Sequence, residues 1–154
     1  GVVLVKGGWL YLLGGEKGFV DPADYFNDVW RTKDGKHWEL VTENAGWSPR
    51  PGHKCAVLAN HFVCMGGFGI PFNPMDIWVS KDGASWKQVS DSPWNATSPD
   101  DIRYDFDMLT VKGGMGGQKP SILTFGGDRE TFILPPEVNF FRVENDVWSY
   151  SPVD

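Results

Sequence analysis

Short apolar runs, separated by glycine and polar turn residues, dominate the sequence. Runs of four to eight residues rich in β-branched and aromatic side chains are typical of β-strands. The clearest set lies in the middle of the chain, where Asp82-Gly83 marks a tight turn between the last two runs. Its four runs are Lys54–Leu58, His61–Met65, Asp76–Ser80 and Trp86–Val89. This set predicts four antiparallel strands joined in sequence order.

The same set recurs on either side. Before it stand the runs Val2–Val5, Trp9–Leu13, Asp28–Thr32 and Trp38–Val41. After it stand only three, Met108–Val111, Ile122–Phe125 and Asp146–Tyr150. No segment shows convincing helical periodicity. We therefore predict one all-β unit over residues 1–154, with repeats at 1–42, 53–90 and 104–154, the last of them incomplete.

Three sequence markers repeat with the strands. Glycine pairs end the second run of each unit, at Gly14-Gly15, Gly66-Gly67 and Gly126-Gly127. An acid, an aliphatic residue and a tryptophan form the third run, at Asp28-Val29-Trp30, Asp76-Ile77-Trp78 and Asp146-Val147-Trp148. A period of about 50 residues with four strands is typical of a propeller blade.

These markers resemble those of the kelch repeat family. The residues that carry the likeness are Met65-Gly66-Gly67, Trp78 and the preceding Arg50-Pro51-Gly52-His53. Together with Asp82-Gly83 and Trp86, they are similar to the kelch variant of galactose-oxidase-like propellers. Unit three offers Arg103-Tyr104-Asp105 as its counterpart of the arginine stretch. The resemblance implies a partial β-propeller of about three four-stranded kelch-type blades, and a protein-binding or scaffolding role.

The repeated residues have structural explanations. Glycine permits a positive φ and close backbone approach where the second strand ends. We expect Trp30, Trp78 and Trp148 to occupy one equivalent position and to pack between neighbouring blades. Asp34 and Asp82 are expected to accept backbone hydrogen bonds in turns rather than to bind metal.

Composition and charge narrow the classes of partner. The chain of 154 residues carries a net charge of −6. An acidic protein lacks the basic face that nucleic acid requires, so we expect no nucleic-acid partner. No apolar run approaches the roughly 20 residues of a membrane-spanning helix, so we expect no membrane insertion.

The candidate metal ligands do not form a set. If Ala59-Asn60 is a two-residue turn, Cys55 lies opposite Cys64, and His53 shares their face while His61 points away. A cross-strand disulfide and two reduced thiols both remain open, and a structural zinc would lack a fourth ligand. No nucleophile elbow and no copper set of the oxidase kind occurs. We therefore expect no cofactor, no metal and no enzymatic activity. The two cysteines, with the glycosylation sequon at Asn95, favour a secreted or extracellular setting.

The loops offer the candidate binding face. Links between second and third strands, and between units, open on one face of a propeller, and here they are rich in aromatic residues. Exposed aromatic side chains mark contact surfaces, although the same rings also pack back over blade edges. The candidates are Phe19, Tyr25, Phe26, Trp47, Phe68, Phe72, Trp94, Phe132, Phe140 and Phe141.

Three blades are too few to close a propeller, which needs four to eight. We therefore expect the apolar flanks of blades one and three to be buried against a second copy, the remaining blades of a larger propeller, or a complex neighbour. The leading function is a non-catalytic protein-binding or scaffolding module. One alternative is carbohydrate binding by the loop aromatics and the acids Asp21, Asp24, Asp100 and Asp101. Another is a fragment of a propeller enzyme.

Overall fold

The computed structural model describes residues 1–18, 21–69, 73–91, 94, 102–113, 119–128 and 144–151. Within these ranges the regular elements are eleven β-strands and a single 3-10 turn at Pro22–Asp24 (η1), which Asp21 caps. The predicted all-β fold is confirmed. Every strand expected from the apolar runs is present, with ends shifted by up to three residues.

The strands form three separate antiparallel sheets, each in sequence order. Sheet one contains β1 (Val2–Lys6), β2 (Trp9–Glu16), β3 (Tyr25–Thr32) and β4 (Trp38–Thr42). Sheet two contains β5 (Lys54–Leu58), β6 (His61–Met65), β7 (Asp76–Ser80) and β8 (Lys87–Asp91). Sheet three contains β9 (Asp107–Val111), β10 (Ser121–Phe125) and β11 (Val147–Tyr150).

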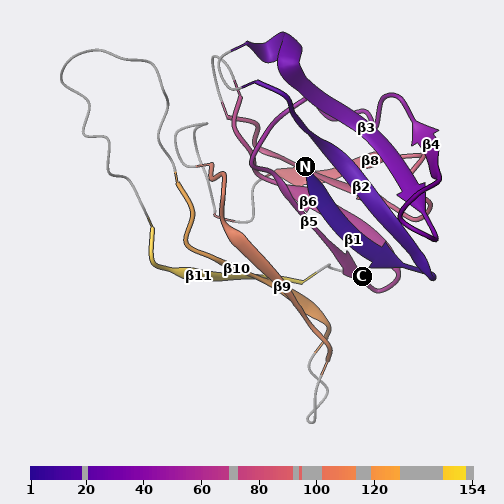
Figure 1. The fold of residues 1–154 in the computed structure, drawn as a ribbon. Helices are drawn as coiled ribbons and strands as arrows, with labels where there is room; N and C mark the ends of the chain where they lie inside the picture. Colours follow the sequence, from indigo (N-terminus) through magenta and orange to yellow (C-terminus); the bar gives the residue numbers. More distant parts are fainter. Residues whose placement is uncertain are drawn as a thin grey trace.

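The three sheets follow one another face to face (Figure 1). Their first strands lie side by side, with β5 next to both β1 and β9. First strands grouped in this way are the innermost strands of propeller blades. The array does not close, so the fold is a partial propeller-like assembly.

Turn chemistry sets the strand register. Ala59 and Asn60 both have positive φ, 46° and 63°, as a two-residue hairpin turn of the primed type requires. This turn pairs Cys55 with Cys64, the register that the sequence predicts. The turn after β3 is held by Asp34, which accepts hydrogen bonds from the amides of Lys36 and His37. Asp82 accepts the equivalent bonds after β7.

The glycine pairs mark the closest approach between blades. Gly66 has a φ of 69°, and a Cβ there would lie 2.4 Å from the ring of Phe106 and 2.6 Å from the carbonyl oxygen of Arg103. No L side chain fits this position, so the end of β6 can pass directly against the segment that leads into sheet three.

Each sheet has a face that carries the tryptophan of its third strand, here called the Trp face, and an opposite face. The three tryptophans are equivalent in register. Trp30 pairs with Leu12, Trp78 with Cys64 and Trp148 with Thr124, all on the neighbouring second strand. The repeat expected from the sequence is thus present in the strand pairing.

The core consists of two interfaces of the same kind. Tyr11, Leu13 and Val29, on the opposite face of sheet one, cover the Trp face of sheet two around Phe62 and Trp78. In the same way, the opposite face of sheet two covers the Trp face of sheet three, and there Ala56, Leu58, Val63, Met65 and Ile77 meet Ile122 and Trp148. Both interfaces therefore join an opposite face to the Trp face of the next sheet.

Candidate binding surfaces

The structure describes five of the ten aromatic residues proposed for the binding face. Tyr25, Trp47, Phe68 and Trp94 are buried, at most 5% exposed, and Phe26 is 38% exposed. The other five, Phe19, Phe72, Phe132, Phe140 and Phe141, lie outside the described residues. Asn95, Asp100 and Asp101 lie outside them as well.

The four buried rings pack across the ends of the sheets. Phe68 makes edge-to-face contacts with Tyr25 and Tyr104, so this cluster joins segments from all three repeats. Trp47 contacts Trp86 edge-on, with the ring centroids 4.3 Å apart. Trp94 packs on Phe106 and Arg103. These four side chains therefore pack over the blade edges, which is the alternative to an exposed contact surface.

Two buried arginines clasp the blades at their third strands. Arg50 is only 3% exposed and binds Asp76 bidentately, with 3.0 Å between Nη2 and Oδ2. It also donates to the carbonyl of Gly66 at 3.3 Å. Arg103 repeats the arrangement in sheet three, donating to both carboxylate oxygens of Asp146 and, at 3.3 Å, to the carbonyl of Gly126.

These ion pairs hold both carboxylates in the charged form. Burial raises the pKa of Asp76, but the hydrogen bonds and positive charge of Arg50 outweigh that effect, and the pKa lies below its ordinary value. For Asp146 the hydrogen bonds from Arg103 are the largest influence, and they lower the pKa to about 2. Each clasp is therefore a charge-assisted link between a blade and the segment that precedes it.

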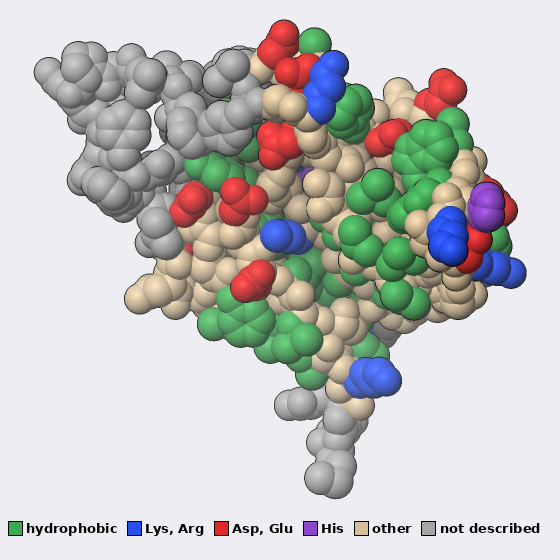
Figure 2. Space-filling view, in the orientation of Figure 1, with side chains coloured by type: hydrophobic (Ala, Val, Ile, Leu, Met, Phe, Trp, Pro, Cys, Tyr) green, Lys and Arg blue, Asp and Glu red, His purple; other side chains and the backbone are tan. Residues whose placement is uncertain are grey.

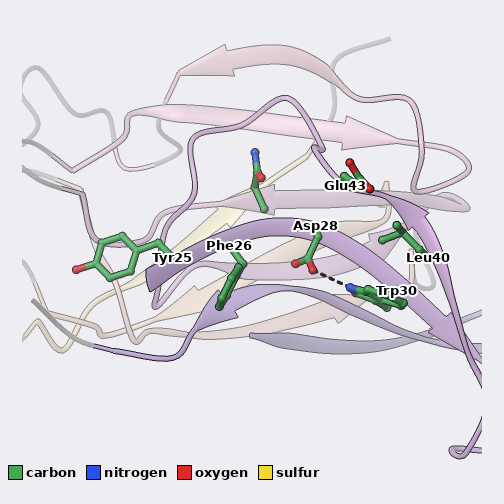
Figure 3. Close-up of a pocket in the computed structure, with 7 residues that line it drawn as sticks. Tyr25, Phe26, Asp28, Trp30, Leu40 and Glu43 are labelled. Carbon is green, nitrogen blue, oxygen red and sulfur yellow. Dashed lines mark hydrogen bonds between the residues drawn. The ribbon is translucent and has the colours of Figure 1, made fainter. Parts of the chain in front are cut away.

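Asp28 occupies the equivalent position in sheet one, where the described residues supply no arginine. Its Oδ2 accepts a hydrogen bond from the indole Nε1 of Trp30 at 2.7 Å, as Asp146 does from Trp148 at 2.8 Å. Figure 3 shows this carboxylate in an open depression of about 360 Å³ on the Trp face of sheet one. The depression is lined by Tyr25, Phe26, Asn27, Asp28, Trp30, Leu40 and Glu43.

Two sheet faces are exposed and apolar. The Trp face of sheet one bears Val3 at 56% and Val5 at 70% exposure, together with Trp38 and Leu40. Figure 2 shows hydrophobic side chains gathered over this sheet. The opposite face of sheet three bears Leu109 at 54%, Val147 at 57%, and also Val111 and Phe125. These surfaces are the two halves of the interface that occurs twice inside the chain.

The candidate metal ligands serve structural purposes. Cys55 and Cys64 are joined in a cross-strand disulfide. Burial, reinforced by the nearby charge of Arg50, lowers the pKa of His53 to about 3, so the ring is neutral and its Nδ1 donates to the carbonyl of Arg50 at 3.0 Å. Among the residues that the structure describes, no three His, Cys, Asp or Glu side chains are grouped to hold a metal ion.

The acids proposed for sugar binding are only partly described. Asp21 accepts a hydrogen bond from the amide of Ala23 within η1, and Asp24 pairs with Lys17 at 3.2 Å. Within the described ranges, no helix is long and apolar enough to cross a membrane.

The arginine clasps are interactions that the sequence pattern does not predict. The sequence places both arginines in the repeated stretch before a first strand, but it does not pair them with the acid of the Asp-aliphatic-Trp marker. The signal is present in the spacing, because Arg50 and Arg103 each stand four residues before a first strand. The link between marker and arginine spans 26 and 43 residues, which no local pattern reveals.

No protein-family model and no curated protein sequence matches this chain.

Proposed function

We propose that the chain is a non-catalytic, kelch-type propeller segment that acts as a protein-binding or scaffolding module. The observation that carries the proposal is the pair of exposed faces. The Trp face of sheet one and the opposite face of sheet three have the same register positions as the surfaces buried inside the chain. A sheet presented by another polypeptide can therefore dock on either face by the packing already seen.

The kelch type is supported by the repeated glycine pair, the tryptophan at one register position, and the arginine clasps. Soluble monomers rarely expose contiguous apolar patches larger than a few hundred Å². Burying about 400 Å² on one face is worth about 10 kcal/mol before the cost of association. A free-energy gain of this size supports a binding role for the two exposed faces.

The partner we propose for the first test is a second copy of the chain, with sheet three of one copy placed on sheet one of the other. Light scattering on the purified chain is expected to give a mass above 17.2 kDa. Val5→Glu and Leu109→Glu each place a charge on one exposed face. Each variant on its own is therefore expected to give a lower mass in light scattering than the unmodified chain. Val89→Glu, on an exposed residue of β8 outside both faces, is the matched control.

Mixing the two variants sharpens the test. Val5→Glu keeps the face of sheet three, and Leu109→Glu keeps the face of sheet one. One intact interface can therefore form between unlike variants, and a mass near twice that of the monomer is expected in the mixture only. A soluble, cooperatively melting monomer for the unmodified chain would contradict the proposal.

Carbohydrate binding stays a second proposal because of the depression at Asp28. Phe26 and Trp30 offer ring faces on which a sugar could stack, and the carboxylates of Asp28 and Glu43 offer acceptors for hydroxyl groups. Binding on a glycan array, lost in Trp30→Ala and retained in Trp38→Ala, would favour this function.

A further inference from the structure

The carboxylate of Asp28 is held in the same way as a carboxylate that binds arginine. Asp28 and Asp146 each stand two residues before the third-strand tryptophan and each accept its indole hydrogen at nearly equal distance. Asp146 also receives two hydrogen bonds from Arg103. Among the described residues, only Trp30 donates a side-chain hydrogen bond to the Asp28 carboxylate, and none supplies the cation that Asp76 and Asp146 bind.

The depression beside Asp28 fits a flat cation. Its lining holds the carboxylates of Asp28 and Glu43 and the rings of Phe26 and Trp30, and none of its described lining residues is basic. Figure 3 shows Phe26, Asp28 and Trp30 on β3, and Glu43 directly after the end of β4. A guanidinium group can bind a carboxylate with two parallel hydrogen bonds and lie against aromatic faces, whereas an ammonium offers only a point charge.

We propose that the Asp28 depression is a binding site for the guanidinium of an arginine side chain carried by polypeptide outside residues 1–154. The inference rests on the proposed function, because a segment that docks further polypeptide can receive the arginine from it, and it names the chemistry that this polypeptide presents on sheet one. Asp28 is the bidentate acceptor, Trp30 orients it, and Glu43 adds a second negative charge at the rim. Sheets two and three bind Arg50 and Arg103 at the same register position.

The first experiment uses the indole signals in a nitrogen–proton NMR spectrum. The probe is N-acetyl-arginine methylamide, with the citrulline analogue, a neutral isostere, as the matched control. The protein is the Leu109→Glu variant, in which the Trp face of sheet one stays free even if copies associate. The arginine probe is expected to shift the Trp30 indole signal saturably, with a dissociation constant of about 1–50 mM.

Trp148 is the internal control, because its acceptor Asp146 is already occupied by Arg103. Its indole signal is expected to stay in place, and Asp28→Asn is expected to abolish the shift at Trp30. An equal response to the citrulline probe, an equal shift at Trp148, or no saturable shift would overturn the proposal. A shift of Trp30 by free sugars but not by arginine would assign the depression to carbohydrate instead.

A second experiment tests the position of the arginine. In sheet two the sequence Arg50-Pro51-Gly52 precedes His53, and Gly1 is the register equivalent of His53. Adding Arg-Pro-Gly ahead of Gly1 therefore places an arginine where Arg50 stands in its own repeat. This extension is expected to raise the melting temperature by about 2–4 °C over a Gln-Pro-Gly extension.

The gain in melting temperature is expected to vanish in the Asp28→Asn background, and equal melting temperatures for the two extensions would overturn the proposal.

Both measurements are independent of the association test. If the chain stays monomeric but binds the arginine probe, the sheet-docking function is wrong and the arginine site is supported. If the chain associates but the Trp30 signal does not respond to arginine, only the arginine site is wrong.

Discussion

Sheet one and sheet two have the same four-strand pattern but different surroundings. In sheet two both faces are covered, Trp78 packs against a core cluster, and Asp76 is bound by Arg50. In sheet one the described residues cover only one face, Trp30 lines an open depression, and the Asp28 carboxylate accepts a hydrogen bond from Trp30. Local sequence therefore forms each four-stranded sheet, whereas the neighbouring sheets determine which of its residues are buried.

The largest expected effect separates residues that are equivalent in register but differ in burial. Ile77 is fully buried between sheets two and three, while its counterpart Val147 in sheet three is 57% exposed. Ile77→Ala is expected to lower the free energy of unfolding by about 3 kcal/mol, because it leaves a cavity. Val147→Ala is expected to cost less than about 0.5 kcal/mol. Urea unfolding measures both, and similar losses would break the comparison.

The next effect concerns the arginine clasp. Arg50→Ala leaves the half-buried carboxylate of Asp76 without its cation, and the expected loss is about 3 kcal/mol. Asp28→Asn changes the equivalent carboxylate of sheet one, where no described arginine is lost, and the expected change is below about 1 kcal/mol. Thermal melting of both variants tests this, and a large loss in Asp28→Asn would show that the sheet-one site is already filled.

The disulfide distinguishes the two sheets at their first hairpins. Cys55 and Cys64 close a loop with a sequence separation of 9, and the equivalent pair in sheet one is Val3 and Leu12. Replacing both cysteines by alanine is expected to cost about 2–3 kcal/mol, chiefly because the unfolded chain gains freedom. Melting with and without a reducing agent measures it. The reductant should not affect the double variant, and a shift there would point to another cause.

The smallest expected effect is a pH dependence at the entry to sheet two. Folding lowers the pKa of His53 from its ordinary 6.5 to about 3, so the unfolded chain takes up a proton that the folded chain refuses. The stabilising contribution is complete above pH 6.5 and is lost as the pH falls toward 3. At pH 5 the expected loss is about 2 kcal/mol.

His53→Gln is expected to remove the part of the pH profile that lies between pH 6.5 and 5. The equivalent residue of sheet one is Gly1, which has no side chain that could titrate. An unchanged profile in His53→Gln, measured by urea unfolding at several pH values, would assign the dependence to other groups.

Much of the fold was predictable because the signals are local. The two-residue Ala59-Asn60 turn predicts a single register for the apolar runs on either side of it, and the Asp34 and Asp82 turns follow from their own neighbours in sequence. The candidate binding face was less predictable. Aromatic residues in loops can be either exposed or buried, and the local sequence does not distinguish the two. Tyr25 and Phe68 are buried because they pack with Tyr104, which belongs to a different repeat.

The strands, their order, the repeat and the equivalence of the three tryptophans follow from the sequence, because apolar runs and the turn residues between them act over a few neighbouring positions. Which tryptophan face is covered, and which aspartate binds an arginine, depends on how the sheets pack together. Those outcomes depend on contacts between segments 26 or more residues apart, which arise when one sheet packs on the next. Trp30 and Trp78 share a local motif and a register, but sheet one packs on the face that carries Trp78, whereas no described sheet packs on the face that carries Trp30.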